Sequence, residues 1–146
     1  MDLLTKSISV FFHSRQKAIE KYYNHAHELQ DLQLKYLLKT AEKTEWGKRY
    51  GFNTIHSHND FCRIPVQTYD SLKADIKRML NGESNIIWPT PVKWFAKSSG
   101  TTSDKSKFLP VTSEVLKKTH YQGGFDTVAL YLRNNTQSRF FQGKGL

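Results

Sequence analysis

The chain of 146 residues has a single cysteine, Cys62, which excludes an internal disulfide framework. A lone thiol fits a reducing compartment, so we expect a cytoplasmic protein. Residues 1–12 contain a short apolar stretch, but Asp2 and Lys6 interrupt it and it lacks the layout of a signal peptide. No apolar run approaches the roughly twenty residues that a membrane span requires. We therefore expect no membrane partner.

Acidic residues are few. The chain has 13 Asp and Glu and 22 Lys and Arg, which gives a net charge of +9. Such an excess can indicate a nucleic-acid or membrane partner, but the basic residues are scattered along the chain. Trp46, Trp88 and Trp94 alternate with lysines, as in proteins that bind single-stranded nucleic acid. Core packing explains Trp46 and Trp94 more simply. A basic nucleic-acid-binding module nevertheless stays open as an alternative.

A complete metal-site pattern is also missing. His56, His58 and Cys62 have metal-ligand residue types, but no second cysteine or clear fourth ligand follows at zinc-site spacing. The His-x-His spacing would suit a strand, whereas Asn59 and Asp60 favour a turn. We interpret the segment as a surface turn and not as a metal site. No Ser/His/Asp nucleophilic arrangement can be derived from spacing alone.

The first half of the chain has helical periodicity, and residues 14–82 are expected to be mainly helical. Within residues 14–44, apolar side chains recur at the spacing i, i+3, i+4, i+7. Ser57 has the features of an N-cap for a short turn. A helix is predicted to begin at Thr68 or Asp70 and to stop at Gly82.

The second half, residues 92–146, is expected to run strand, loop, strand, helix, strand. The strands are predicted at residues 92–97, 107–111 and 139–142. The helix should open at Ser113, and Gly123 and Gly124 should weaken it by about 1 kcal/mol each relative to alanine. This order predicts an α/β or α+β fold, with an amino-terminal helical layer followed by the start of a sheet. Because the sheet has few strands, we expect it to be incomplete and the chain to be part of a longer protein; a complete small domain is the alternative.

The loop between the first two predicted strands is the most informative segment. From Lys97 to Lys107 it contains six hydroxyl residues, one glycine and three lysines. Such a loop offers many backbone N–H groups to a phosphate, and a lysine at its edge can neutralise charge. It is not a Walker A loop, because Gly100 is not followed at the right spacing by Gly-Lys-Ser/Thr. A polar surface hairpin is the plain alternative.

The order of these residues resembles the phosphate-binding loop of adenylate-forming enzymes, Ser-Gly-Thr-Thr/Ser-x-Gly-x-x-Lys. It resembles more closely the loop of the auxin-responsive acyl-acid amido synthetase family, which opens Ser-Ser-Gly-Thr and is soon followed by proline. Asp104 stands where that family usually has glycine. Residues 46–52, 64–70 and 141–145 also resemble the family's amino-terminal region. The positions that fit the loop are Ser98, Ser99, Gly100, Thr101, Thr102, Lys107 and Pro110.

The resemblance implies an ATP-dependent ligase that forms an acyl-adenylate from a carboxylic acid and transfers the acyl group to an amine of an amino acid. Mg²⁺ is implied as the companion of ATP. Tyr121 and Phe125 can line an acyl pocket, although core packing also explains them. Lys107 is the one candidate for a direct part in the reaction. The ATP and phosphate ligands implied are Ser98, Ser99, Gly100, Thr101, Thr102 and Lys107.

The same resemblance implies that residues 1–146 are the amino-terminal portion of one larger ATP-binding domain, similar to that of adenylate-forming enzymes. The partners are then ATP, a carboxylic acid, an amino acid and the missing carboxy-terminal part of the same protein, with no nucleic acid. Alone, the fragment should be inactive. A degenerate, non-catalytic family member is a further alternative.

Overall fold

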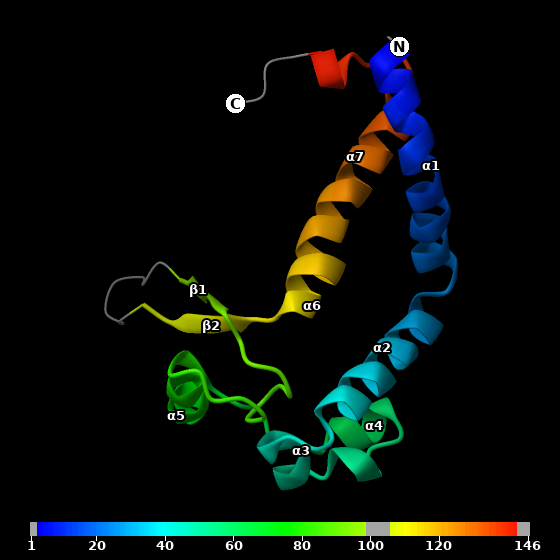
Figure 1. Ribbon diagram of the computed structural model, residues 1–146. Helices are drawn as coiled ribbons and strands as arrows, with labels where there is room; N and C mark the ends of the chain where they lie inside the picture. Colours follow the sequence, from blue (N-terminus) through cyan, green and yellow to red (C-terminus); the bar gives the residue numbers. More distant parts are fainter. Residues whose placement is uncertain (1–2, 99–105, 143–146) are drawn as a thin grey trace. The chain divides into compact units, whose positions relative to one another are not determined.

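The computed structural model describes residues 3–98 and 106–142. Backbone proximity divides the chain into two compact units. We call His27–Ser113 the central unit, and Met1–Ala26 together with Glu114–Leu146 the terminal unit. The described residues are mostly helical and contain one two-stranded antiparallel sheet, which confirms the predicted fold class (Figure 1).

The terminal unit is built on two long helices that lie side by side, α1 (Leu3–Asn24) and α7 (Gln122–Asn134) (Figure 1). Phe12 of α1 is buried against Ala129 and Leu132 of α7. Beside this apolar contact, Arg15 donates two hydrogen bonds to the Asp126 carboxylate, at 2.7 and 3.0 Å. The short helix α6 (Ser113–Val115) and the π-helix η2 (Leu116–Tyr121) lead directly into α7.

Short helices with defined caps make up much of the central unit. Thr44, Ser57 and Thr68 each accept a backbone N–H with their side chain at a helix start, as small hydroxyl residues do. Ser57 forms a full capping box with Asp60, which confirms the predicted N-cap. The helices are α2 (Ala26–Ala41), α3 (Glu45–Arg49), η1 (Phe52–Thr54), α4 (His58–Phe61) and α5 (Tyr69–Leu80).

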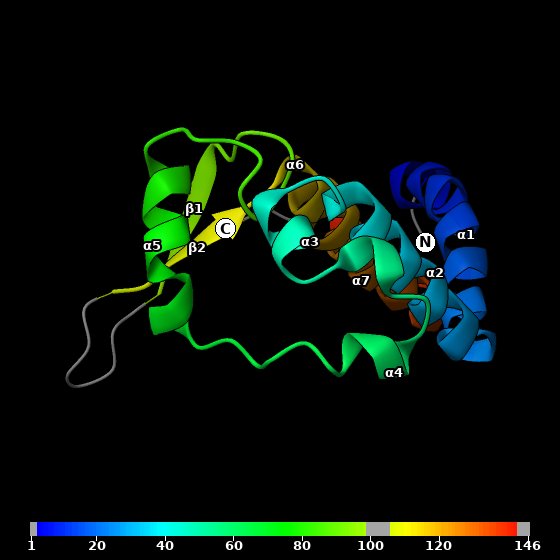
Figure 2. The same cartoon turned by 90° about the horizontal axis from the view of Figure 1, so that it is seen from below.

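The sheet of the central unit consists of β1 (Trp94–Lys97) and β2 (Phe108–Val111), paired antiparallel from Trp94↔Val111 to Lys97↔Phe108. Both strands were predicted, with slightly wider bounds. Helix α5 packs against β2, and Figure 2 shows it running alongside the strand pair. The core beneath is formed by Met79, Ile86 and Val92, with Phe95 of β1 packed on it.

The helical pattern of residues 14–44 belongs to two helices separated at His25, and the first of these, α1, begins at Leu3 and packs on α7 through Phe12. One expectation about an element is wrong. The strand expected over residues 139–142 is the 3₁₀-helix η3 (Phe140–Gln142). Phe141 packs on the Phe12 cluster there. No strand in the described residues lies beside this segment to form the hydrogen bonds of a sheet with it. In the described ranges, no helix has the length and apolar character needed to cross a membrane.

Candidate phosphate-binding site

The strand pair holds the two ends of the predicted phosphate loop together. The backbone N–H of Ser98 donates to the Lys107 carbonyl oxygen at 3.0 Å, directly beyond the Lys97↔Phe108 pair. The backbone N–H of Lys107 donates in return to the Ser98 Oγ at 3.2 Å. The first hydroxyl and the lysine of the motif, nine positions apart in sequence, are therefore brought to one point.

Helix α5 contributes a residue that sequence reasoning did not select, Tyr69. It is the first residue of the helix, following the N-cap Thr68. Its hydroxyl accepts the backbone N–H of Phe108 at 3.0 Å, and its ring centre lies 5.5 Å from the Lys107 Nζ. Tyr69 thus touches both the first residue of β2 and the side chain of the motif lysine. Its sequence signals were a place directly after a predicted cap and a position within residues 64–70, which resemble the family.

The chemistry of the described side chains fits an anionic ligand. Lys107 is exposed, and it forms no ion pair with any residue in the described ranges. Its positive charge is therefore not neutralised within that part of the chain, and a hydroxyl donor, Ser98, stands beside it. Hydroxyl and ammonium groups are suitable donors to phosphate oxygens. Ser99, Gly100, Thr101 and Thr102, together with Asp104, lie outside the described residues.

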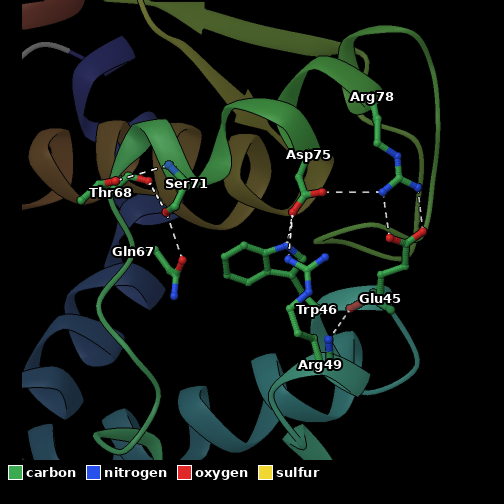
Figure 3. A network of polar contacts seen from close by, with 10 residues as sticks. Glu45, Trp46, Arg49, Gln67, Thr68, Ser71, Asp75 and Arg78 are labelled. Carbon is green, nitrogen blue, oxygen red and sulfur yellow. Dashed lines mark hydrogen bonds and ion pairs between the residues drawn. The ribbon is translucent and has the colours of Figure 1, made fainter.

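A polar network fixes the carboxy-terminal half of α5 to α3 (Figure 3). Asp75 is buried and accepts the Trp46 indole N–H at 2.6 Å, with the Arg49 guanidinium at 3.3 Å. Arg78 binds the Glu45 carboxylate in a bidentate manner at 2.7 and 2.8 Å and also pairs with Glu83. The hydrogen bonds from Arg78 lower the pKa of both Glu45 and Glu83. This network stabilises the helix that presents Tyr69.

The two residues predicted for an acyl pocket lie in the terminal unit. Phe125 stands on α7 with its ring centre 6.5 Å from that of Phe11 and 6.1 Å from that of Phe12, so it shares in the aromatic packing of α1. Tyr121 ends the π-helix and is 56% exposed, and Phe125 is 48% exposed. Their role in acyl binding stays a prediction.

A separate hollow of about 630 Å³ lies between α2 and α4 in the central unit. It contains none of the predicted site residues. The Nε2 of His58, on the wall of this hollow, lies 3.6 Å from the Cys62 Sγ. Both residues are exposed, so the segment lies at the surface as expected, but residues 58–61 form the short helix α4. Within the ranges that the structure describes, no three His, Cys, Asp or Glu residues are grouped to hold a metal ion. The lining residues are His27, Gln30, Asp31, Gln33, Leu34, Leu37, His58 and Phe61.

The structure places Trp46 and Trp94, both predicted to serve in packing, in different environments. The Trp46 indole is half-buried and anchored to Asp75, as a packing role requires. Trp94 is 51% exposed on β1. Packing therefore accounts for Trp46, whereas Trp94 presents an open aromatic face.

Comparison with known proteins identifies the family. Residues 15–146 match the GH3 family N-terminal domain. The chain is 31% identical over 109 residues to indole-3-acetic acid-amido synthetase GH3.4 of Arabidopsis thaliana, covering 73% of the chain and 18% of that protein. It is 30% identical over 124 residues to jasmonoyl--L-amino acid synthetase JAR6 of Nicotiana attenuata, covering 82% of the chain and 21% of that protein. The chain thus spans about a fifth of these relatives. It belongs to the GH3 family, which confirms the resemblance read from its phosphate loop.

Proposed function

We propose that this chain is the amino-terminal portion of one larger ATP-binding domain in an ATP-dependent acyl-acid amido synthetase. Its relatives are named as amido synthetases for indole-3-acetic acid and as a jasmonoyl-amino acid synthetase. The observation that carries the proposal is the pairing of Ser98 with Lys107, which joins the ends of the family's phosphate loop. The single cysteine supports a cytoplasmic location as part of the same proposal.

The proposed reaction has two half-reactions. A carboxylate oxygen of the acid bonds to the α-phosphorus of ATP, and pyrophosphate leaves. The amine nitrogen of an amino acid then bonds to the acyl carbon, and AMP leaves. A free carboxylate is a poor electrophile, and the adenylate supplies the leaving group that it lacks. The protein's task at the loop is to neutralise charge and to position the departing pyrophosphate.

Each loop residue has a proposed part in this task. Ser98, Ser99, Thr101 and Thr102 offer hydroxyl and backbone donors to the phosphates, and Gly100 allows close approach of the backbone. Lys107 acts as a point cation against the phosphate charge. Mg²⁺ would shield the triphosphate, but no residue of the chain is assigned to it. Tyr121 and Phe125 are proposed for the acyl pocket.

Exchange of labelled pyrophosphate into ATP tests this proposal. The full-length protein should catalyse exchange that depends on a carboxylic acid. Lys107→Ala should reduce exchange by about a hundredfold, since removal of one group that stabilises developing charge costs about that much. Lys93→Ala removes the same charge from the residue that precedes β1, at the end of the strand away from the loop, and should leave exchange unchanged. If folded Lys107→Ala protein exchanged pyrophosphate into ATP at the wild-type rate, Lys107 would have no part in the reaction.

A nucleic-acid-binding module is the second candidate, favoured by the net charge of +9 and by exposed Trp94. The two candidates differ in their response to salt. Binding to an oligonucleotide releases counterions, so its affinity should fall steeply as salt is raised. Saturable MgATP binding should survive moderate salt. Tight oligonucleotide binding with a steep salt slope, and no ATP binding, would favour the second candidate.

A further inference from the structure

At the outer edge of β2, a backbone N–H group donates to a side chain of α5 and not to a neighbouring strand. In an antiparallel pair, neighbouring residues point their N–H groups alternately toward the partner strand and away from it. The backbone N–H of Lys107 points toward Ser98, so the N–H of Phe108 points outward. The Tyr69 hydroxyl accepts this outward N–H at 3.0 Å. A side chain of α5 therefore satisfies the backbone at the point where the phosphate loop becomes a strand.

The ring of the same residue lies beside the motif lysine. The Lys107 Nζ is 5.5 Å from the centre of the Tyr69 ring, within the range of a cation–π contact. A lysine side chain otherwise samples many rotamers, and no carboxylate in the described ranges pairs with this one. Among the described residues, the Tyr69 ring is therefore the contact that restricts where the Lys107 ammonium group lies.

Tyr69 can hold this position because α5 is firmly anchored. Thr68 caps the helix start, and Ile76 and Met79 are buried farther along. The Asp75 and Arg78 network ties the same helix to α3 (Figure 3). A side chain on a rigid element places its partner more precisely than one on a loop does.

We infer that Tyr69 is a positioning residue for ATP, acting through its hydroxyl on the return strand and through its ring on Lys107. The inference rests on the proposed function and deepens it, because it assigns to α5 a part in holding the loop's cation toward the phosphates. Tyr69 itself is not placed in contact with the reacting atoms.

Two substitutions in the full-length protein separate the hydroxyl from the ring. Tyr69→Phe keeps the ring and should raise the half-saturating ATP concentration in pyrophosphate exchange about threefold. Tyr69→Leu removes both contacts and should raise it about tenfold. The half-saturating concentration of the carboxylic acid should stay within about twofold, which general structural damage would not produce. Tyr131→Leu is the matched control, since its hydroxyl also accepts a hydrogen bond and its ring also packs, but on α7.

A double-mutant cycle tests whether the ring acts through Lys107. In a Lys107→Ala background, the difference between Tyr69→Phe and Tyr69→Leu should disappear. If Tyr69→Leu does not fold, Tyr69→Phe alone decides, and an unchanged ATP constant in it overturns the inference. Equal losses for ATP and for the acid, or a ring effect that persists without Lys107, also overturn it while leaving the proposed function intact. Absence of exchange in the wild-type protein overturns both.

Discussion

Gly47 marks a close approach between the end of α2 and the start of α3. A Cβ atom at this buried position would lie 2.1 Å from the Ala41 carbonyl oxygen and 2.5 Å from that of Glu42. Both atoms belong to the backbone, so they cannot move aside as a flexible side chain would. The Gly47 N–H also donates to the Thr44 Oγ1 at 2.9 Å, which fixes the turn. The space at this position excludes any residue with a Cβ atom, so glycine is required.

We therefore predict that Gly47→Ala destabilises the fold by about 1–3 kcal/mol or more, as overpacking does. Gly123→Ala is the matched control, because its Cβ would meet no atom within 4 Å. In helix α7 that change should stabilise by about 0.5–1 kcal/mol. Urea unfolding midpoints of both variants check the pair. Equal changes of the same sign in the two unfolding midpoints would contradict the prediction that Gly47 is required for close backbone packing.

At the scale of elements, Arg78 joins α5 to α3 and to the turn that follows α5. It binds Glu45 and Glu83 together, and the buried Asp75 carboxylate lies 3.6 Å away. These hydrogen bonds lower the pKa of Glu45 and of Glu83 from the ordinary value of 4.5. Groups with a lowered pKa stabilise the folded state above their ordinary pKa, and this contribution is lost as the pH falls through the folded value.

The stability of the central unit should accordingly decrease as the pH is lowered below 4.5. Arg78→Gln should lose stability at neutral pH and show a smaller further decrease in acid, because its glutamates no longer have a depressed pKa. Arg133→Gln on α7 removes an exposed guanidinium that forms no ion pair with any residue in the described ranges, and it should keep the wild-type pH profile. Urea unfolding at a series of pH values measures all three. An Arg78→Gln profile parallel to the wild type would refute the linkage.

Local chemistry made several elements predictable. The caps at Ser57 and Thr68 depend on hydroxyl residues near their own helices, and Gly82 takes a positive φ of 89° just after α5, as a helix-stopping glycine does. The two strands of the hairpin were predicted from the apolar stretches on either side of the loop. These features involve residues close in sequence, where propensity and spacing are informative.

Other features depend on contacts between distant residues. Phe141 packs on the Phe12 cluster of α1, and this long-range contact favours a 3₁₀ turn over the predicted strand. The break at His25 and the π-helix before α7 had no signal in the apolar periodicity. Of the site, the motif identified Ser98 and Lys107, whereas Tyr69, which lies 38 positions before Lys107 and contacts it, was missed. These features depend on tertiary packing, which the spacing of residues in the sequence does not indicate.

At the scale of the whole molecule, one face of the hairpin is apolar and open. Trp94 and Leu109 are 51% and 48% exposed, and the strand register places them on the same face as Ala96 and Val111. The opposite face carries Phe95, which packs on the core. A two-stranded sheet with a bare apolar face needs further packing for stability.

We predict that the 146-residue chain on its own aggregates or binds a hydrophobic dye. Trp94→Lys together with Leu109→Lys should reduce the dye signal, because both side chains belong to the open face. Trp46→Phe is the control, since its indole is anchored to Asp75 and is not part of that face. Size-exclusion chromatography with dye fluorescence measures this. A monodisperse monomer with a sharp unfolding transition and no dye binding would speak against it.

We propose that this chain holds the phosphates of ATP beside Lys107. The most direct test of this proposal is amine labelling of the full-length protein, with each lysine quantified by mass spectrometry while MgATP is titrated. We expect saturable protection of Lys107, with the exposed Lys93 labelled equally at every ATP concentration. Labelling of Lys107 that does not change with MgATP, in folded protein, would contradict it.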